Sequence, residues 1–535
     1  MHSLTLGDVA HEHARTYTDE TATVCYGARV TYHELDERVN RLASQLAAHG
    51  ITSGDRVLWL GQNCHRVLEL LLAAGRLGAM VCPVNWRQSA AEIAFVIDDL
   101  APRVIVWQEE ALGDVIREAR GQAAHASALW LQHDGGGSDS YEALVAAGAP
   151  EAPRVDVDPA SPVLIIYTAA FGGRPNGSLL THTGLLTQDG NLFKLADMWP
   201  GFTYLNNGPL FHIGTFMYTV ATFHIGGKNV FTRRADPVDV MRLIADEKCT
   251  AGFVLPPTIA KIVELNADRA YDLSSFRSPI RMEGWNDMVR QDTTPFGTRS
   301  MGGYGQTEVT GLDVYTAYGG RPGVTTAGRP SPWTRVTIVD EGGNEVPDGE
   351  TGEIVFRGPM VHAGYWNRPE INAYRTRSGG WHTNDIGCRE QDGVVAFIGP
   401  KTQMIKSGVE NIYPAEVESC IERLAGVKEV AIIGVPDEKY VQSVKAIVVA
   451  ADGAAVRAED IIEHCRQQIA SYKKPKSVEF IDALPRTPAG GKDYSVLDAK
   501  FGGGGYPGGS TRSNLRLQGA SKWQMTTGTL SRTSS

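Results

Sequence analysis

Helical and strand-like apolar patterns alternate along the first part of the chain. In residues 31–50 the apolar side chains recur at three- and four-residue intervals, which predicts an amphipathic helix terminated by Gly50. Short apolar runs predict strands at residues 55–60 and 104–107, with a further helix at residues 66–77. Alternation of this kind is typical of an α/β fold with parallel strands.

The alternation continues to about Gly399 and then changes. Before that point, strands are predicted at residues 252–255, 335–340 and 352–357. Beyond it, the pattern predicts a small α+β domain of ordinary size. Its predicted helices are residues 415–424 and 458–470, and its predicted strands are residues 427–435, 443–450 and 477–480.

We therefore predict an α/β protein with two folded domains, because 535 residues are too many for one compact core. A large N-terminal domain of layered, parallel-rich sheets and helices is expected over residues 1–399, followed by a hinge at residues 400–403. A small, mobile α+β C-terminal domain is expected over residues 404–500. Residues 501–535 begin with FGGGGYPGGS and end in a Ser/Thr-rich run, which predicts a disordered tail.

Charge and cysteine content narrow the class of protein. The formal net charge is −10, which argues against nucleic acid or an anionic membrane as the main partner. No apolar run reaches transmembrane length, and the first residues lack the charged-then-apolar pattern of a secretory leader. The seven cysteines stand singly, without a CxxC pair. Their spacing predicts reduced thiols in a cytoplasmic enzyme, and neither a disulfide framework nor a zinc site.

The most informative stretch of the chain is residues 167–182, which read YTAAFGGRPNGSLLTH. An apolar run at residues 162–166 precedes it, and a helical pattern follows from Gly184. A strand, a glycine-rich loop and a helix in this order present backbone N–H groups to phosphate. The stretch therefore predicts a phosphate-binding loop, although not a kinase-type P-loop, because GxxxxGK[ST] is absent.

Together with the later motifs given below, this stretch resembles the phosphate loop of the adenylate-forming enzymes, which include acyl-CoA synthetases, peptide-synthetase adenylation domains and luciferases. The resemblance covers about residues 4–498. Against the family's usual YTSGTTGxPKG, the matching residues are Tyr167, Thr168, Gly173, Pro175 and Gly177. The differing residues are Ala169, Ala170, Phe171, Gly172 and Asn176. The loop has lost most of its hydroxyls and its lysine, and the resemblance leaves Thr168, Gly173 and Arg174 to contact phosphate.

A second motif is GGYGQTE at residues 302–308, which matches the family's YGxTE. The resemblance implies that Tyr304 packs on adenine, Thr307 contacts the nucleotide phosphate and Glu308 holds Mg²⁺. A carboxylate suits this role, since Mg²⁺ prefers oxygen ligands and bridges phosphate oxygens. The same resemblance assigns nucleotide contacts to three further residues of the motif, Gly303, Gly305 and Gln306. For Glu308, the alternative is an ordinary loop glutamate without a metal-binding role.

Two later motifs supply Asp385 and Lys492. Residues 380–387 read GWHTNDIG and match the family's GWxxTGDxG, which implies that Asp385 accepts the ribose hydroxyls; a turn aspartate is the alternative. Residues 484–492 read LPRTPAGGK and resemble LPRTxxGK, with one extra residue before the Gly-Lys pair. The resemblance implies that Lys492 stabilises charge while the substrate carboxylate attacks the α-phosphate. A solvated surface lysine is the alternative.

Three other positions carry weaker assignments. His212, in PLFHIG at residues 209–214, is expected at the acyl pocket, with a core histidine as the alternative. Gly284, in RMEGW at residues 281–285, falls in the expected adenine-side loop, where Trp285 either shapes the pocket or belongs to the core. Gly408 is expected to line the pantetheine tunnel or simply to form a turn. The hinge around it departs from the family at Pro400, Gln403 and Val409.

Three functions remain open on the sequence alone. The first is an ATP-dependent acid–CoA ligase that uses Mg²⁺ and forms an acyl-adenylate, with adenylation weakened or rearranged, but not abolished, by the altered phosphate loop. The second transfers the acyl group to an amine, which the hinge departures favour. The third is a non-catalytic binder of nucleotide or acyl-adenylate. An apolar or aromatic acid is suggested by Phe211, Phe216, Met217, Tyr218, Phe253 and Trp285, although such residues are more often core.

Overall fold

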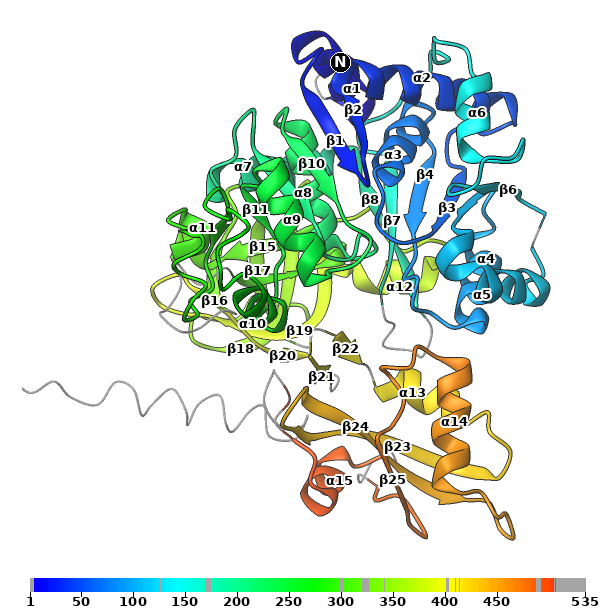
Figure 1. Ribbon diagram of the computed structural model, residues 1–535. Helices are drawn as coiled ribbons and strands as arrows, with labels where there is room; N and C mark the ends of the chain where they lie inside the picture. Colours follow the sequence, from blue (N-terminus) through cyan, green and yellow to red (C-terminus); the bar gives the residue numbers. More distant parts are fainter. Residues whose placement is uncertain are drawn as a thin grey trace, which may run out of the picture. The chain divides into compact units, whose positions relative to one another are not determined.

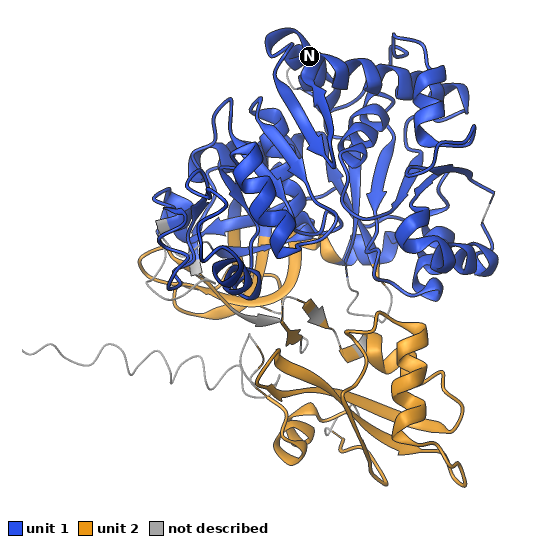
Figure 2. Cartoon of the chain, viewed as in Figure 1, with its two compact units in different colours: residues 1–168, 176–335, 356–374 blue, residues 169–175, 336–355, 375–535 orange. Residues whose placement is uncertain are grey.

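The computed structural model divides the chain into two compact units, which are coloured separately in Figure 2. Unit 1 comprises residues 1–168, 176–335 and 356–374, and unit 2 comprises residues 169–175, 336–355 and 375–535. The structure describes residues 4–504 and 506, except residues 126, 169–174, 299–301, 320–326, 341, 401–403, 409, 413 and 487–491. Within that part of the chain, no helix has the length and apolar character needed to span a membrane.

The first sheet of unit 1 has the strand order β6-β5-β3-β4-β7-β8 (Figure 1). Its strands are β3 (Arg56–Leu60), β4 (Met80–Pro83), β5 (Val104–Trp107), β6 (Leu129–Gln132), β7 (Pro162–Thr168) and β8 (Asn176–Thr181). Neighbouring strands pair in parallel except β7 and β8. Side chains alternate between the two faces. Leu58 and Ile105 pack with helices α4 (Ala90–Leu100) and α5 (Glu109–Gln122), whereas Val57 and Val106 pack on the opposite face.

The second sheet of unit 1 has the strand order β11-β9-β10-β1-β2 and is parallel except for the β1–β2 hairpin. Its strands are β1 (Thr21–Cys25), β2 (Ala28–Thr31), β9 (Thr203–Asn206), β10 (Lys228–Phe231) and β11 (Ala251–Gly252). Helices α9 (Pro237–Glu247) and α10 (Pro256–Leu265) pack with the face that carries Leu205 and Val230. These two sheets give the parallel-rich α/β class that the sequence predicts.

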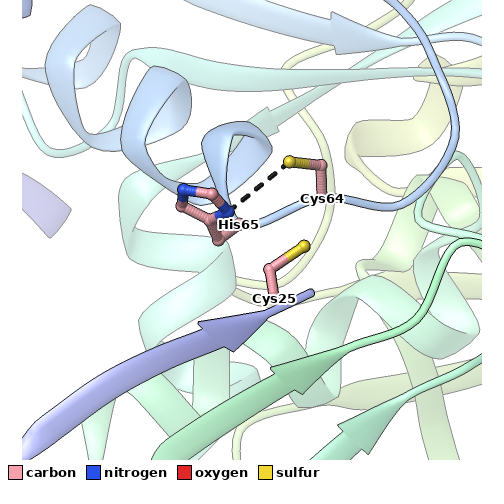
Figure 3. Close-up of side chains that lie close together, drawn as sticks. All are labelled: Cys25, Cys64 and His65. Carbon is pink, nitrogen blue, oxygen red and sulfur yellow. Dashed lines mark hydrogen bonds between the residues drawn. The ribbon is translucent and has the colours of Figure 1, made fainter. Parts of the chain in front are cut away.

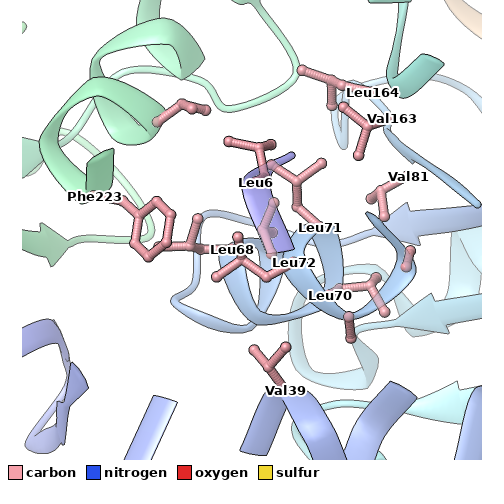
Figure 4. Packing of buried hydrophobic residues seen from close by; sticks show 14 of the residues in the cluster. Leu6, Val39, Leu68, Leu70, Leu71, Leu72, Val81, Val163, Leu164 and Phe223 are labelled. Carbon is pink, nitrogen blue, oxygen red and sulfur yellow. The ribbon is translucent and has the colours of Figure 1, made fainter. Parts of the chain in front are cut away.

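The largest core of unit 1 joins side chains of both sheets through the helices between them. Figure 4 shows the part of this core around Leu70, Val81 and Phe223. Helices α1 (Leu6–Thr16), α2 (Tyr32–Ala48), α3 (Arg66–Arg76) and α8 (Ile213–His224) contribute to it. Helix α3 is apolar on nearly every side, which is the pattern of a fully buried helix. Leu70, Leu71 and Leu72 are each 0% exposed, and burial of one such side chain contributes roughly 1.5–3 kcal/mol.

The rest of unit 1 forms the surroundings of the candidate site. Strands β14 (Gly303–Gln306), β15 (Gly311–Tyr315) and β16 (Ala327–Pro330) form an antiparallel ribbon, and the short 3₁₀ helix η1 (Thr307–Val309) connects the first two. The remaining elements are α6 (Tyr141–Ala147), α7 (His182–Leu195), α11 (Pro295–Thr298), η2 (Thr316–Tyr318), α12 (Pro369–Arg375) and the two-residue strands β12 (Arg277–Ser278) and β13 (Arg290–Gln291).

Unit 2 contains two groups of strands. The first has the order β20-β19-β18-β17, formed by β17 (Arg335–Val339), β18 (Thr351–Arg357), β19 (Trp381–Arg389) and β20 (Val395–Pro400), with η3 (Arg377–Gly379) before β19. The second has the order β22-β21-β24-β23, with β25 beside β24. Its strands are β21 (Ile405–Ser407), β22 (Glu410–Ile412), β23 (Val427–Asp437), β24 (Val441–Ala450) and β25 (Ser477–Phe480).

Helices cover both faces of this second sheet of unit 2. Val430 and Ile432 of β23 belong to the core that holds α13 (Pro414–Ile421) and α14 (Ala458–Gln468). Their neighbours along the strand, Ala431 and Ile433, belong to a second core with Leu497 of α15 (Tyr494–Phe501). Strand alternation thus separates the two cores. The predicted α+β composition of the C-terminal region is confirmed by these elements, while its boundaries and the hinge at residues 400–403 stay predictions.

Two predictions about local structure are wrong. The strand predicted at residues 252–255 ends at Gly252, and Leu255 is the N-cap of α10. Proline at the first turn costs no helical hydrogen bond and has the right backbone angle, so Pro256-Pro257 starts a helix. The helix predicted from Gly184 is confirmed by α7, but the predicted order of strand, glycine-rich loop and helix is wrong, because strand β8, which lies within residues 167–182, comes between the loop and α7.

The disorder predicted from Phe501 onward is wrong for the first residues of that segment. Phe501 is the last residue of α15, and Tyr506 is only 4% exposed. The Tyr506 hydroxyl donates to Asp498 at 2.8 Å and accepts from the backbone N–H of Gly434 at 3.0 Å. An aromatic ring among the glycines therefore anchors this segment to the sheet. Residues 507–535 lie outside the described part of the chain.

One buried histidine of unit 1 makes stability depend on pH. Burial lowers the pKa of His182 to about 4, and its Nδ1 accepts a hydrogen bond from the backbone N–H of Leu6 at 3.2 Å. The unfolded chain binds this proton near pH 6.5 and the folded chain near pH 4, so stability is lost as pH falls between these values.

We expect His182→Asn to reduce that loss by about 2 kcal/mol between pH 7 and pH 5. Asparagine retains an oxygen acceptor for Leu6 but has no proton to gain. Urea unfolding at the two pH values measures the difference, with His49→Asn, which changes an exposed histidine, as the control. Equal pH dependence in wild type and His182→Asn would contradict the assignment.

Candidate active site

Glu308 lies at the centre of a buried polar cluster in unit 1. Its side chain follows β14 in η1 and is 7% exposed. Its Oε1 accepts hydrogen bonds from the Tyr365 hydroxyl at 2.6 Å and from the Thr168 hydroxyl at 3.4 Å. Its backbone carbonyl accepts from the N–H of His362 at 2.8 Å. The carboxylate is therefore oriented by hydroxyl groups from two segments that are distant in sequence.

The structure brings two of the predicted residues, Thr168 and Glu308, into contact with each other. Thr168 is the last residue of β7, so the phosphate-loop stretch begins directly beside the carboxylate. Gly173 and Arg174, the other predicted phosphate contacts, lie outside the described residues. The hydrogen bonds that Tyr365 and Thr168 donate to the Glu308 side chain both use Oε1, so among the described residues Oε2 can accept a further ligand.

The base of the phosphate-loop stretch is a β-hairpin held by an ionic network. Strands β7 and β8 pair antiparallel, with Thr168 opposite Asn176. The Arg368 Nε donates to Asn176 Oδ1 at 2.9 Å, and its Nη2 donates to Asp99 at 2.8 Å. Asp99 also accepts from the Tyr167 hydroxyl at 2.7 Å. Asn176, which stands where the family usually has lysine, thus fixes the hairpin through its amide oxygen.

The glycines of the GGYGQTE motif have a structural reason. A Cβ on Gly303 would lie 1.9 Å from the carbonyl oxygen of Val314, and one on Gly305 would lie 1.9 Å from that of Gly311. Both residues therefore permit the close pairing of β14 with β15. Their predicted role in nucleotide binding stays a prediction, as does that of Gln306, the residue that precedes η1.

Tyr304 and Thr307 flank the glutamate. The Tyr304 ring is 6% exposed and stacks on Phe356, with ring centroids 5.8 Å apart and an interplanar angle of 18°. Thr307 is half-buried, and its carbonyl accepts from the N–H of Thr310 at 3.0 Å. Thr310 has a φ of +59°, a left-handed conformation that is unusual for threonine. Its hydroxyl donates to the carbonyl of Met360 at 2.6 Å, which holds that conformation and ends η1 after Glu308.

His212 and Gly284 lie in two other segments of unit 1, and the structure gives each a distinct local role. His212 is the N-cap of α8, with an exposed side chain whose Nδ1 accepts from the N–H of Gly214 at 3.0 Å, so it is not a core histidine. Gly284 has a φ of +75°, and a Cβ there would lie 2.6 Å from the Val263 side chain. Trp285 is 0% exposed and belongs to the core with α9 and α10, which excludes it from a pocket wall.

Asp385 lies on β19 of unit 2, next to a buried ionic group. It is 7% exposed, and its backbone N–H donates to the Thr383 hydroxyl at 3.1 Å. The adjacent Asn384 has a φ of +61° at the position where the family usually has glycine, and its N–H donates to Glu353 at 3.0 Å. Asparagine tolerates this conformation better than most residues. The Glu353 carboxylate also contacts His382 Nδ1 at 3.1 Å, which fixes the strand segment that presents Asp385.

Lys492 directly follows the segment 487–491 in sequence, and its amine forms an ion pair within unit 2. Its Nζ donates to Glu418 at 2.8 Å and lies 3.5 Å from Glu422. Glu418 also accepts from the hydroxyl of Tyr494 and from the N–H of Ile432. The amine is therefore held by carboxylates of α13 and the residue after it, and it is not a solvated surface lysine.

Gly408 is a turn residue of the β21–β22 hairpin. Its φ is +63°, a conformation that favours glycine, and its N–H donates to the carbonyl of Tyr440 at 2.7 Å. The predicted hinge departures Gln403 and Val409 lie outside the described residues.

Sequence reasoning missed the groups that orient the predicted residues. Tyr365 is 57 residues from Glu308, and Glu418 is 74 residues from Lys492. No local pattern marks either residue, since each becomes relevant only when distant segments pack together. Arg368 is a similar case, because its contact with Asn176 spans 192 residues.

The fold and these contacts define an α/β protein that presents an oriented carboxylate beside a glycine-rich hairpin, as nucleotide-binding enzymes do. By sequence, the chain belongs to the AMP-binding enzyme family. The model of that family matches residues 10–366, and the model of the AMP-binding enzyme C-terminal domain matches residues 416–490. The resemblance seen in the motifs is thereby confirmed.

Individual relatives are similar to this chain over nearly its full length. A feruloyl-CoA synthase from Amycolatopsis is 34% identical over 507 residues, which is 94% of this chain and 100% of the relative. The structure of a fatty acyl CoA synthetase from Mycobacterium tuberculosis is 27% identical with a TM-score of 0.64, covering 93% of this chain and 98% of that one. The amide bond synthetase from Marinactinospora thermotolerans shares the fold, with a TM-score of 0.76, 24% identity, and coverage of 93% of this chain and 100% of that one.

Proposed function

We propose that this protein is an ATP-dependent acid–CoA ligase, which activates a carboxylic acid as an acyl-adenylate and then transfers the acyl group to CoA. The observation that carries the proposal is the buried Glu308 carboxylate, oriented by the Tyr365 and Thr168 hydroxyls beside the phosphate-loop stretch. The full-length similarity to a feruloyl-CoA synthase supports the same reaction class.

The residues around Glu308 fit a magnesium ion bound together with a nucleotide. Mg²⁺ is usually held by one or two carboxylates, with phosphate oxygens and water completing its octahedral shell. Glu308 supplies one carboxylate whose Oε1 is fixed by hydroxyl donors. When bound, the ion would neutralise charge on the phosphates. Thr168, with Gly173, Arg174 and Thr307, would position those phosphates beside it.

The remaining roles fall to side chains of this chain. Tyr304 would pack on adenine from its stack with Phe356, with Gly284, Gly303, Gly305 and Gln306 lining the nucleotide. Asp385 would accept the ribose hydroxyls. His212 would orient the substrate carboxylate, and Lys492 would stabilise negative charge while that carboxylate displaces pyrophosphate from the α-phosphate. Thioester formation would follow with CoA, whose pantetheine would pass Gly408.

The structure reduces the set of side chains that could shape the acid pocket. Phe216, Met217 and Trp285 are at most 3% exposed and belong to packed cores. Phe211 and Tyr218 are half-buried and Phe253 is 38% exposed, so these three stay available. All three are aromatic, which keeps an apolar or aromatic acid as the proposed substrate class.

The test is pyrophosphate release from ATP and Mg²⁺ with a panel of aliphatic and aromatic acids, run with CoA, with amines and with neither. We expect release that CoA stimulates, with the acyl-CoA seen by mass spectrometry. Products with amines alone would establish the second candidate, an amide bond synthetase, which the hinge departures Pro400, Gln403 and Val409 favour. ATP binding without release for any acid would leave a non-catalytic binder.

The hairpin network offers a test of how this chain retains a phosphate site without the usual lysine. We expect Arg368→Ala to raise the KM for ATP about 3- to 10-fold with a smaller change in kcat, because it frees Asn176 and the hairpin base. Steady-state kinetics in ATP measures the shift. The control is Arg56→Ala, which removes an arginine of the same region that stacks over Trp366. An unchanged KM for ATP would show that this network does not contribute to phosphate binding.

A further inference from the structure

Two cysteines and a histidine converge in unit 1 (Figure 3), at a cavity whose lining includes neither Glu308 nor the residues that contact it. Cys25 is the last residue of β1, and Cys64 and His65 directly precede α3. Their ligand atoms all lie within 4.8 Å of one another, and Cys64 Sγ lies 3.5 Å from His65 Nδ1. The three residues are 6%, 6% and 4% exposed. No sequence pattern marks this group, because 38 residues separate the first two of its members.

His65 is oriented as a metal-binding histidine usually is. Its Nδ1 faces the sulfur of Cys64, and its Nε2 lies 3.7 Å from the Glu69 carboxylate on the other side of the ring. Glu69 is itself fixed, by Arg38 at 2.8 Å and by the Tyr141 hydroxyl at 3.1 Å. Metal-ligating histidines commonly direct their second nitrogen to such a carboxylate, which sets the tautomer.

A cavity of about 290 Å³ opens onto the three residues. His133 lines the same cavity, is only 4% exposed and stacks on Trp59 with ring centroids 4.5 Å apart. Neither ring nitrogen of His133 has a hydrogen-bond partner among the described residues. A buried imidazole with two unsatisfied nitrogens is costly, and it indicates that this cavity accommodates a ligand or water.

The spacing of the donor atoms suits a tetrahedral ion. With metal–sulfur and metal–nitrogen bonds of about 2.3 Å and 2.0 Å, a tetrahedral ion separates a sulfur and a nitrogen ligand by about 3.5 Å. Cys64 Sγ and His65 Nδ1 already lie 3.5 Å apart. Two sulfurs on such an ion would lie about 3.8 Å apart, within the 4.8 Å limit of the group.

We propose that Cys25, Cys64 and His65 form a binding site for a thiophilic divalent cation of the zinc class, with the fourth position open to the cavity. Two thiolates and one neutral imidazole are ligands that Zn²⁺ prefers over the oxygen ligands preferred by Mg²⁺. The site would tie the end of β1 to the start of α3. It is independent of the proposed ligase reaction.

Cation binding at this site should release protons. Cysteine binds a metal ion as the thiolate and histidine binds it as the neutral imidazole, so any proton held on these ligand atoms passes to solvent when the cation binds.

The test is a Zn²⁺ titration of the full chain, freed of any tag and of metal, with thiols kept reduced by a phosphine. Calorimetry in buffers of different ionisation enthalpy should give one Zn²⁺ per chain with proton release. Co²⁺ used in place of Zn²⁺ should show sulfur-to-metal charge-transfer absorption. We expect Cys25→Ser and Cys64→Ser each to weaken Zn²⁺ binding at least about tenfold.

The matched control is Cys249→Ser, which changes a buried thiol of the same unit whose sulfur contacts the Leu243 carbonyl at 3.4 Å. It should bind Zn²⁺ as the wild type does. If Cys64→Ser fails to fold, the result for Cys25→Ser, at the last residue of β1, is the test. No stoichiometric binding, or binding that both variants retain, would mean that Cys64 and His65 form only a hydrogen-bonded pair.

Discussion

Lys492→Ala is expected to lower the rate of acyl-adenylate formation about 100- to 1,000-fold. Negative charge develops around the α-phosphate as the carboxylate attacks, and the variant lacks the cation that would stabilise it. Single-turnover pyrophosphate release in the presence of acid, ATP and Mg²⁺ measures this step. Thioester formation from a synthetic acyl-adenylate and CoA should be nearly unchanged, because that step has already lost pyrophosphate.

The same substitution has a structural cost that must be separated from the chemical one. Lys492 neutralises Glu418, whose side chain is 9% exposed. Without the amine, Glu418 retains the hydrogen bonds from Ile432 and Tyr494, so the expected loss of stability is only about 1–3 kcal/mol. The small unit should therefore stay folded at room temperature.

Two further lysine variants make the result specific. Lys476→Ala removes another lysine of unit 2 from an ion pair with Asp437 at 2.7 Å, and it should leave both half-reactions unchanged. Lys492→Arg keeps the charge in a different shape and should recover part of the rate. A similar loss in both half-reactions for Lys492→Ala, or a loss below threefold in adenylation, would contradict the role given to this lysine.

The sequence predicted most of the regular elements, because their hydrophobic periods are local. The predicted helix at residues 31–50 is α2, whose N-cap Thr31 and partner Glu34 form a capping box. The strands predicted at residues 104–107 and 477–480 are β5 and β25 without change of ends. Failures came where a local signal had two meanings. Pro256-Pro257 stops a strand and starts a helix with equal ease.

The candidate site was predictable only as far as its motifs are continuous in sequence. Thr168 and Glu308 were found from separate motifs, and their 3.4 Å contact follows from packing that neither motif encodes. Tyr365 and Glu418 carry no signal of their own, since a tyrosine or a helical glutamate is common anywhere. The same limit hid the group of Cys25, Cys64 and His65, because cysteine spacing reports only sites built on one segment.

Glu308→Gln is expected to lower the rate of adenylation about 100-fold and to raise the Mg²⁺ concentration needed for half-maximal rate. Loss of about 3 kcal/mol of transition-state stabilisation corresponds to that factor, and a carboxylate that holds a dication supplies energy of this order. Glutamine keeps the size of the side chain and an oxygen that accepts from Tyr365 and Thr168. It removes only the negative charge, so the fold of unit 1 should be preserved.

Tyr365→Phe tests the orientation of the Glu308 carboxylate separately from its charge. It leaves the Glu308 carboxylate but deletes the 2.6 Å hydrogen bond that fixes Oε1, so the expected rate loss is smaller, about 3- to 10-fold. Initial rates over a Mg²⁺ series at saturating ATP distinguish the two variants, because only Glu308→Gln should shift the Mg²⁺ dependence strongly. If high Mg²⁺ leaves Glu308→Gln as fast as wild type with an unshifted Mg²⁺ dependence, Glu308 does not hold the ion. The buried carboxylate would then serve only to fix η1 beside the hairpin.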